Sequence, residues 1–337
     1  MKKINLAIVG ASGVVGRTFL EVLEEKNLLM ENVENFYVFA SKRSAGNKIN
    51  FKGKEYTIEE LTENSFDRGI DIALFSAGGS TSAKFAPIAS SKGCIVIDNS
   101  SYFRMDKDVP LVVPEVNPED IKNHNGIIAN PNCSTIQAVV ALKPLHDKYK
   151  LKRVVYSTYQ AVSGAGRGGL MDLENGLKGE DPTTFLYPIV NNCIPQIDEF
   201  LDNGYTKEEE KMIKETRKIL HDDSLKVTAT TVRVPVANGH SESINVEFHN
   251  GFELEELVKE LENMQGLIIQ NDFKNKEYPL ATKSVGTDEV YVGRIRRDES
   301  LDNGINMFVV ADNIRKGAAS NAVQIAEYII NNNIINK

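Results

Sequence analysis

The chain has 337 residues, 41% hydrophobic and 26% charged, as is typical of a globular protein with two domains. Its formal net charge of −8 argues against nucleic acid as the main partner, and its three cysteines are too few and odd in number for a disulfide framework, which fits a reducing cytoplasm. No apolar run is long enough to cross a bilayer, so the sequence gives no sign of a membrane partner.

The first 132 residues alternate between short apolar strands and helices. We expect strands at 4–10, 35–40, 71–77 and 94–100, and helices at 14–26 and 81–92. This alternation is typical of a parallel sheet with helices on both faces. The first strand leads straight into a glycine-rich turn, which is the pattern of a β-strand rather than of a signal peptide.

The turn after the first strand contains Gly10, Gly13 and Gly16, spaced G-x-x-G-x-x-G. This is a variant of the commoner G-x-G-x-x-G motif. Glycines between a strand and a helix permit a tight turn and bring the backbone close to a phosphate at the helix N-terminus. The turn therefore predicts dinucleotide binding; the alternative is a packing turn that binds nothing.

The end of the second strand indicates which dinucleotide is bound. NAD sites usually place an acidic residue there to hold the ribose 2′-hydroxyl. This chain offers Ser41, Arg43 and Ser44 instead, and the stretch has no Asp or Glu. A guanidinium with two hydroxyls suits a 2′-phosphate, which favours NADP; the alternative is a solvated basic loop.

The second half of the chain has longer and more alternating strands, as is typical of an α+β domain on an antiparallel or mixed sheet. The expected strands are 153–164, 225–235, 242–250, 290–298 and 305–313, and the expected helices are 135–149, 207–220 and 253–264. A last amphipathic helix at 318–332 can pack back on the first domain. We expect a nucleotide-binding domain at 1–132, joined by the C-terminal helix of about 314–337, and a catalytic and dimerisation domain at 133–313.

Cys133 precedes a helix, where backbone N–H groups and the helix dipole favour the nucleophilic thiolate. Ser134 or Thr135 can cap that helix. The alternative reading, a small buried apolar residue, applies better to Cys94 and Cys193. A reactive cysteine beside a nicotinamide domain suggests aldehyde oxidation or acyl reduction through a thioester.

This chemistry needs a base, and most of the histidines lie in polar surroundings. His240 follows a strand and a glycine turn, seven residues after Arg233. The two side chains can reach one cleft from adjacent strand ends. The alternative for His240 is an ordinary loop histidine.

Several segments together resemble the aspartate-semialdehyde dehydrogenase family over nearly the whole chain. They include GASGVVG, SKRSAG, DNSSYFRM, PNCST, QAVSGAG, VRVPVANGHSES and DNIRKGAA. The pair PNCST and QAVSGAG is specific, and the lack of marked insertions resembles the shorter bacterial type. The resemblance implies a Rossmann-like NADP-binding domain and a catalytic domain of the glyceraldehyde-phosphate-dehydrogenase type.

The resemblance also implies a reaction, the NADPH-dependent reductive dephosphorylation of L-aspartyl 4-phosphate to L-aspartate 4-semialdehyde, on the path to lysine, methionine and threonine. It assigns Cys133 as the nucleophile, His240 as the general acid/base and Gln160 as the residue that orients the reacting group. It assigns the substrate carboxylate to Arg233, the amino group to Glu208, and the phosphate to Arg104 and Lys211 with Asn132.

Glu215 and Lys218 form a second possible set beside Glu208 and Lys211. The cofactor contacts implied are Gly10, Ser12, Gly13, Val14, Val15, Arg43, Ser44, Ser163, Gly164 and Asn313. The resemblance implies no metal site, and it implies a homodimer or homotetramer joined through the second-domain sheet. Two alternatives are a reductase of another acyl phosphate and a catalytically dead NADP-binding regulator.

Overall fold

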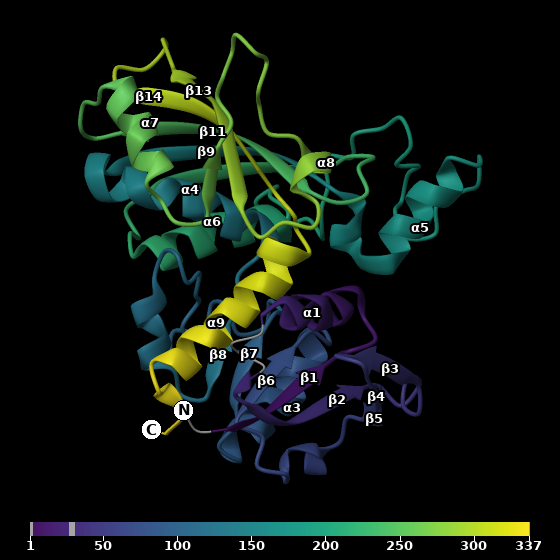
Figure 1. The fold of residues 1–337 in the computed structure, drawn as a ribbon. Helices are drawn as coiled ribbons and strands as arrows, with labels where there is room; N and C mark the ends of the chain where they lie inside the picture. Colours follow the sequence, from purple (N-terminus) through teal and green to yellow (C-terminus); the bar gives the residue numbers. More distant parts are fainter. Residues whose placement is uncertain (1–2, 27–30, 337) are drawn as a thin grey trace. The chain divides into compact units, whose positions relative to one another are not determined.

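The computed structural model describes residues 3–26 and 31–336, and the chain divides into two compact units. Unit 1 runs up to Pro131 and resumes at Ala318, and unit 2 runs from Asn132 to Gly317. Each unit has its own sheet (Figure 1).

Unit 1 is built on a parallel sheet in the order β5-β2-β1-β6-β7-β8. The strands are β1 (Ile4–Val9), β2 (Val33–Ala40), β5 (Glu59–Glu60), β6 (Ile72–Phe75), β7 (Ile95–Asp98) and β8 (Ile127–Ala129). The chain moves from β1 outward to β2 and then returns to the other side of β1 at β6. Ligands of such sheets bind at this reversal, outside the carboxyl ends of the strands.

Every residue of β6 and β7 is buried, because helices cover both faces of the unit 1 sheet. Helix α1 (Val14–Glu25) packs beside α9 (Ser320–Asn331), and α3 (Gly79–Ser91) packs on β7 and β8. The C-terminal helix thus completes the core of unit 1. A hairpin of β3 (Lys48–Phe51) and β4 (Lys54–Thr57) and the 3₁₀ turns Glu63–Phe66 and Pro118–Asn123 complete this unit.

The glycines of the first turn have different structural reasons. Gly10 has a φ of +93°, and a Cβ there would lie 2.2 Å from the carbonyl oxygen of Ser76. A Cβ at Gly16 would lie 2.1 Å from the carbonyl oxygen of Gly10, so the helix packs closely on the turn. At Gly13 the nearest atom would be 3.4 Å away. The turn therefore requires glycine at positions 10 and 16. At Gly13, which is exposed, a Cβ would make only an ordinary contact.

Unit 2 contains a mixed sheet in the order β10-β9-β11-β14-β13-β12. The strands are β9 (Leu151–Gln160), β10 (Lys226–Arg233), β11 (His240–Phe248), β12 (Leu267–Ile269), β13 (Val290–Arg297) and β14 (Gly304–Ala311). Strand β9 is parallel to β10 and antiparallel to β11. The parallel first sheet and this mixed second sheet confirm the predicted fold class.

One face of the unit 2 sheet is covered by helices, and along β11 buried and half-buried residues alternate strictly. The helices are α4 (Cys133–Tyr149), α6 (Lys207–Leu220) and α7 (Leu254–Glu262), with α4 packed against the other two. On the opposite face Tyr159 is exposed and its ring lies 6.3 Å from that of Phe308. A short helix, α8 (Ala281–Ser284), and the 3₁₀ turn Val162–Ala165 complete unit 2, whose last residues belong to the π-helical turn Arg315–Ala319.

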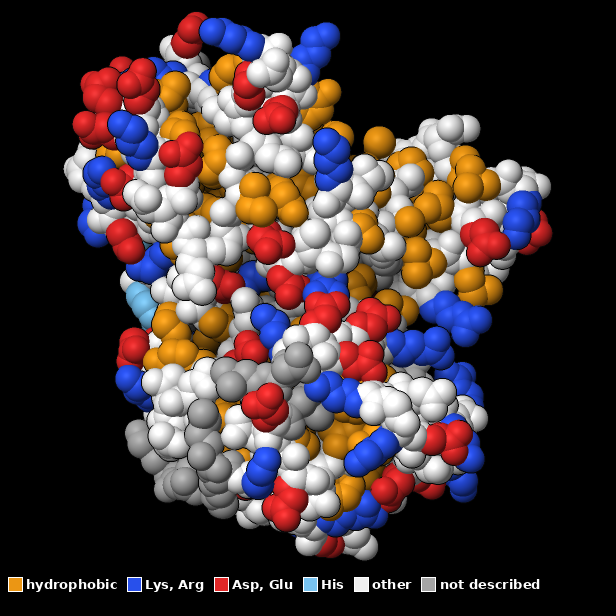
Figure 2. Space-filling view, in the orientation of Figure 1, with side chains coloured by type: hydrophobic (Ala, Val, Ile, Leu, Met, Phe, Trp, Pro, Cys, Tyr) orange, Lys and Arg blue, Asp and Glu red, His pale blue; other side chains and the backbone are white. Residues whose placement is uncertain are grey.

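The segment around α5 (Gly166–Gly176) extends away from this sheet (Figure 1). It carries exposed apolar side chains (Figure 2). Among them are Leu177 and Leu186, which are 72% and 79% exposed. The buried carboxylate of Asp172 accepts hydrogen bonds from the backbone N–H groups of residues 183–185 and from the Thr183 hydroxyl. These bonds fold the segment back on its own helix.

No helix within residues 3–26 and 31–336 is long and apolar enough to span a membrane.

We predict that Gly16→Ala destabilises unit 1, because its Cβ would overlap the Gly10 carbonyl. Overpacking of this kind costs about 1–3 kcal/mol, which lowers the midpoint of thermal unfolding by several degrees. Gly79→Ala is the matched control, since its Cβ would have no neighbour closer than 3.9 Å. Equal midpoints for the two variants, measured by calorimetry, would contradict this packing.

Candidate active site

The start of helix α4 is fixed by Asn132. Its side-chain oxygen accepts hydrogen bonds from the backbone N–H groups of Ser134 (3.0 Å) and Thr135 (3.3 Å), so Asn132 is the N-cap. The expectation that Ser134 or Thr135 caps this helix is therefore wrong, because both lie within its first turn. Cys133 is the first helical residue and is half-buried. The helix dipole favours a thiolate at this position.

Two carboxylates of α6 hold Asn132 in turn. Its backbone N–H donates to Glu215 at 2.7 Å, and its side-chain amide donates to Glu208 at 2.9 Å. The two acids are seven residues apart, about two helical turns, so they lie on the same face of α6. Both are buried. Of the second candidate set, Glu215 thus contacts the backbone next to Cys133, whereas Glu208 contacts the side chains of Asn132 and Gln160.

Three strands bring polar side chains to one end of the unit 2 sheet. Gln160 ends β9 and is in register with Arg233, which ends the parallel strand β10. His240 begins β11, which runs antiparallel to β9 and therefore starts where β9 ends. All three side chains are buried, and the Gln160 Nε2 lies 3.4 Å from the His240 Nε2.

The peptide of Ala161 connects His240 and Arg233. The Ala161 N–H donates to His240 Nδ1 at 3.0 Å, and the Arg233 guanidinium donates to the Ala161 carbonyl at 2.7 Å. Because Nδ1 accepts a hydrogen bond, the proton of the neutral ring lies on Nε2. Burial, and then the charge of Arg233, lower the pKa of His240 well below its ordinary value. The ring is therefore neutral near pH 7.

Glu208 and Lys211 form an ion pair beside this cluster. Glu208 accepts from Gln160 at 3.1 Å, and Lys211 lies 3.2 Å from Glu208 and 2.8 Å from Asp198. Burial disfavours the charged form of Glu208, but Lys211 and the two amides outweigh it, so the pKa of Glu208 is lowered. For Lys211 burial is outweighed by Glu208 and Asp198, and its pKa is raised. Both groups are charged at neutral pH.

Arg233 interacts electrostatically with both Glu208 and Cys133. Burial lowers the pKa of the guanidinium, and these two groups oppose the shift. An arginine stays charged even so. The structure therefore brings together Asn132, Cys133, Gln160, Glu208, Lys211, Arg233 and His240 within unit 2.

Glycines allow the backbone to approach this cluster. A Cβ at Gly164 would lie 2.7 Å from Arg233 Nη1 and 3.3 Å from His240 Nε2. A Cβ at Gly317 would lie 2.8 Å from the Cβ of Cys133. Sequence reasoning missed Gly317, which is far from Cys133 in the chain, and it missed Asp198, which lies in the loop before α6 and carries no helical spacing to Lys211. Nearby, Asn313 donates to the Ser163 hydroxyl (3.0 Å) and accepts from the Gly239 N–H (2.9 Å).

In unit 1 the candidate residues occupy two places. Arg104 is buried and donates to the carbonyls of Asn99 and Asn130, each at 2.9 Å. The remaining candidates surround the glycine turn, whose Gly10 and Ala11 N–H groups bond the Phe39 carbonyl near the end of β2. Those candidates are Ser12, Gly13, Val14, Val15, Arg43 and Ser44.

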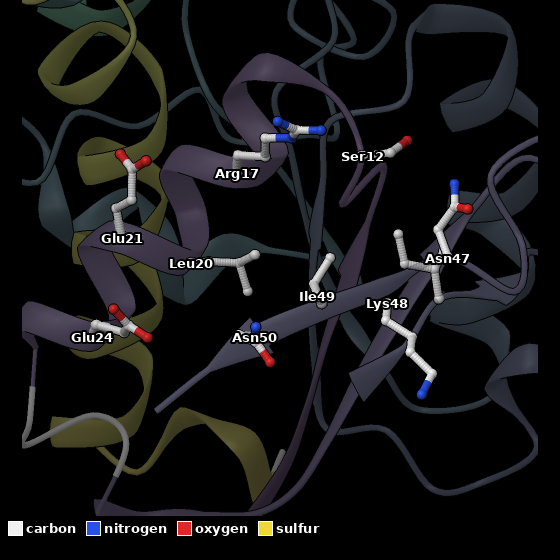
Figure 3. A pocket seen from close by; sticks show the side chains of 10 residues that line it. Ser12, Arg17, Leu20, Glu21, Glu24, Asn47, Lys48, Ile49 and Asn50 are labelled. Carbon is white, nitrogen blue, oxygen red and sulfur yellow. The ribbon is translucent and has the colours of Figure 1, made fainter. Parts of the chain in front are cut away.

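The glycine turn fits a nucleotide phosphate. Gly13 is the N-cap of α1, and in the described part of the chain no side chain caps this helix. The first N–H groups of α1 are thus available to an anion. Arg43 is exposed in the loop after β2. A cavity of about 580 Å³ between α1 and β3 begins at Ser12 and is lined by Asn47 among others (Figure 3).

Over residues 3–26 and 31–336 no group of three or more His, Cys, Asp or Glu side chains is arranged to hold a metal ion.

Family models match both units. The model described as semialdehyde dehydrogenase, NAD binding domain, covers residues 5–124, and the one described as semialdehyde dehydrogenase, dimerisation domain, covers residues 142–316. They indicate a nicotinamide cofactor and support a homodimer.

Relatives in other organisms match over almost the whole chain. An aspartate-semialdehyde dehydrogenase of Aquifex aeolicus is 57% identical, covering 98% of this chain and 99% of its own, and one of Bacillus subtilis is 47% identical with the same coverage. A crystal structure of aspartate semialdehyde dehydrogenase II of Vibrio cholerae complexed with ASA has a TM-score of 0.94 at 48% identity, with 98% and 99% of the two chains covered.

A structure of the Candida albicans enzyme with NADP has a TM-score of 0.80 at 26% identity, covering 99% of this chain and all of its own. The family matches, the near full-length relatives and the shared architecture confirm the resemblance noted in the sequence. The chain belongs to the aspartate-semialdehyde dehydrogenase family.

Proposed function

We propose that the protein catalyses the NADPH-dependent reductive dephosphorylation of L-aspartyl 4-phosphate to L-aspartate 4-semialdehyde, through a thioester on Cys133. The observation that carries this proposal is the cluster at one end of the unit 2 sheet, where Gln160, Arg233 and His240 meet beside the capped start of α4. In the proposed pathway the product serves lysine, methionine and threonine synthesis.

Cys133 is the nucleophile of the proposed reaction. Its thiolate attacks the acyl carbon, so that a carbon–sulfur bond forms and the phosphate leaves with the electrons of the broken carbon–oxygen bond. NADPH, when bound, supplies the hydride for the acyl carbon. Cleavage of the carbon–sulfur bond releases the aldehyde and restores the thiolate.

Buried hydrogen-bonding groups serve the acyl oxygen and the substrate ends. We assign the His240 Nε2–H to the acyl oxygen as general acid, and Gln160 to its orientation. Arg233 binds the substrate carboxylate, since a guanidinium grips a carboxylate with two parallel bonds. Glu208, charged and held by two amides, receives the amino group. Arg104 and Lys211, helped by Asn132, bind the phosphate.

We propose NADP as the cofactor. The glycine turn of Gly10, Ser12 and Gly13, with Val14 and Val15, would hold the pyrophosphate, and Arg43 with Ser44 would hold the 2′-phosphate. In unit 2, Ser163, Gly164 and Asn313 would contact the nicotinamide end. The uncapped first turn of α1 supports this assignment.

We propose a homodimer joined through unit 2. The half-exposed sheet face that carries Tyr159 and Phe308 and the apolar α5 segment offer the surface for a second copy. The match of unit 2 to a dimerisation domain supports this choice.

Substituting the nucleophile tests the reaction. Cys133→Ser should lose several orders of magnitude in NADPH oxidation with aspartyl phosphate, because a hydroxyl is almost never ionised near neutral pH. The exposed Cys193→Ser is the matched control and should keep full turnover. Near-normal turnover of Cys133→Ser, or greater activity of the wild type on acetylglutamyl phosphate, would reject the proposal. So would a wild type that binds NADPH but turns over neither substrate.

The pH profile tests His240. The lowered pKa keeps its ring neutral as the pH falls through 6.5, so protonation of His240 should reduce kcat/KM only at clearly lower pH. His240→Asn should reduce turnover about a hundredfold or more, and the fall of kcat/KM on the acid side of the pH profile should disappear. The profile is measured in the oxidative direction with semialdehyde, NADP and phosphate. If kcat/KM of the wild type already falls at or above pH 6.5, and this fall is absent in His240→Asn, the ring becomes protonated at that pH and the assignment of a neutral ring is wrong.

Arg43 should set the cofactor preference. Charge-assisted bonds to a 2′-phosphate contribute about 1.5–3 kcal/mol, which corresponds to a preference for NADPH of roughly ten to more than a hundredfold. Arg43→Ala should weaken NADPH and leave NADH nearly unchanged in titrations of both cofactors. Lys42→Ala, at the exposed neighbouring cation, is the matched control. Equal weakening of both cofactors by Arg43→Ala would make Arg43 a structural residue of the loop.

A further inference from the structure

Glu242 is a buried acid that the proposed mechanism does not use. It lies two residues after His240 on β11, on the face of the strand that is buried, and its side chain is fully inaccessible to solvent. Its cross-strand neighbours are Thr158 on β9 and Val309 on β14, neither of which carries a charge. Neither of these two cross-strand neighbours therefore offers a positive charge to offset the burial of its carboxyl.

The neighbours of Glu242 on helix α4 are Ser134 and Gln137, both fully buried. Within the described ranges, the Ser134 hydroxyl, the Gln137 side-chain oxygen and both Glu242 oxygens have no partner at hydrogen-bond geometry. The Gln137 amide nitrogen is already turned to the His240 carbonyl at 3.4 Å. Buried polar atoms are costly unless they are paired, so this group of four atoms needs an internal arrangement.

The protonation state of Glu242 decides which arrangement is possible. A carboxylate can only accept hydrogen bonds, so it could pair with the Ser134 hydroxyl but would leave the Gln137 oxygen, which also only accepts, without a donor. A carboxylic acid has one O–H donor and an oxygen left to accept. Burial raises the pKa of Glu242 well above its ordinary value, and the negative charge of Glu208 adds to this shift against the weaker influence of Ser134 and Gln137.

We propose that Glu242 is an uncharged positioning residue, whose O–H donates to the Gln137 side-chain oxygen and whose other oxygen accepts from the Ser134 hydroxyl. These two bonds pair every member of the group. They also tie the first turns of α4 to β11, and so fix Cys133 relative to His240. The proposal deepens the proposed function, on which it rests in taking Cys133 as the nucleophile.

Two substitutions separate this role from others. Glu242→Gln keeps the shape and supplies an N–H donor and a carbonyl acceptor, so it reproduces both bonds without a charge. Glu242→Leu has similar volume and supplies neither. Two other ionisable groups interact electrostatically with Glu242, namely Glu208 on α6 and Tyr156 on β9, and both variants leave them, Cys133 and His240 unchanged.

The first measurement is the rate of alkylation of Cys133 by iodoacetamide across pH, together with kcat and KM. It is made in a Cys193→Ser background because Cys193 is exposed, whereas Cys94 is buried and its pKa is raised by that burial. We expect Glu242→Gln to keep the alkylation profile and turnover within about threefold. Glu242→Leu should lose at least about tenfold in alkylation and kcat while NADPH binding remains. A loss in Glu242→Gln as large as in Glu242→Leu, or no loss in Glu242→Leu, would overturn the proposal.

The second measurement is independent of catalysis and of whether Glu242→Leu folds. An acid whose folded pKa is raised stabilises the fold fully below its unfolded pKa, and this contribution is lost as the pH rises toward the folded value. The thermal midpoint of wild type should therefore fall relative to Glu242→Gln between pH 5 and pH 8. If the difference between the two thermal midpoints stays constant over this pH range, Glu242 is charged in the folded protein, which rejects the proposal. Because this difference does not depend on turnover, an active Cys133→Ser would reject the proposed function and leave this result standing.

Discussion

The capping of α4 by Asn132 is the interaction on which the rest of the candidate site depends. One residue accepts from two N–H groups of the helix and donates to two carboxylates of α6. Glu208, which accepts a hydrogen bond from the Asn132 side-chain amide, also accepts one from the Gln160 amide at the end of β9. The helix start, the neighbouring helix and the sheet end are thereby fixed to one another. This network therefore fixes the backbone on which Cys133 begins the helix.

The candidate site concentrates charge where water is scarce. Arg233, Glu208 and Lys211 are each wholly or largely buried, and isolated ions there would be strongly destabilising. They persist because each has an opposite charge or several hydrogen bonds, and the lowered pKa of Glu208 and raised pKa of Lys211 reflect that pairing. His240 differs, since burial beside Arg233 keeps it neutral. A charged substrate would therefore meet groups whose charges are already set.

Local patterns revealed the fold class and much of the candidate site, because strand alternation, the glycine turn and PNCST are readable over a few residues. They did not reveal that Gln160 and Arg233 end in register, since this depends on the parallel pairing of β9 with β10 across more than sixty residues. Nor did they reveal that Glu215 meets the backbone of Asn132 and Glu208 its side chain, because this depends on how α6 packs against α4. The β3–β4 hairpin carried a signal in Lys52 and Gly53, whose positive φ angles form its turn.

The α5 segment shows how a surface can be ordered without a core of its own. The Asp172 carboxylate closes the chain of residues 183–185 onto α5, so Leu177 and Leu186 are presented by a segment that is already folded. The loss of conformational entropy is thus borne when the monomer folds. A second copy that binds this surface meets a preorganised template, and less of the favourable free energy of association is consumed in ordering the chain.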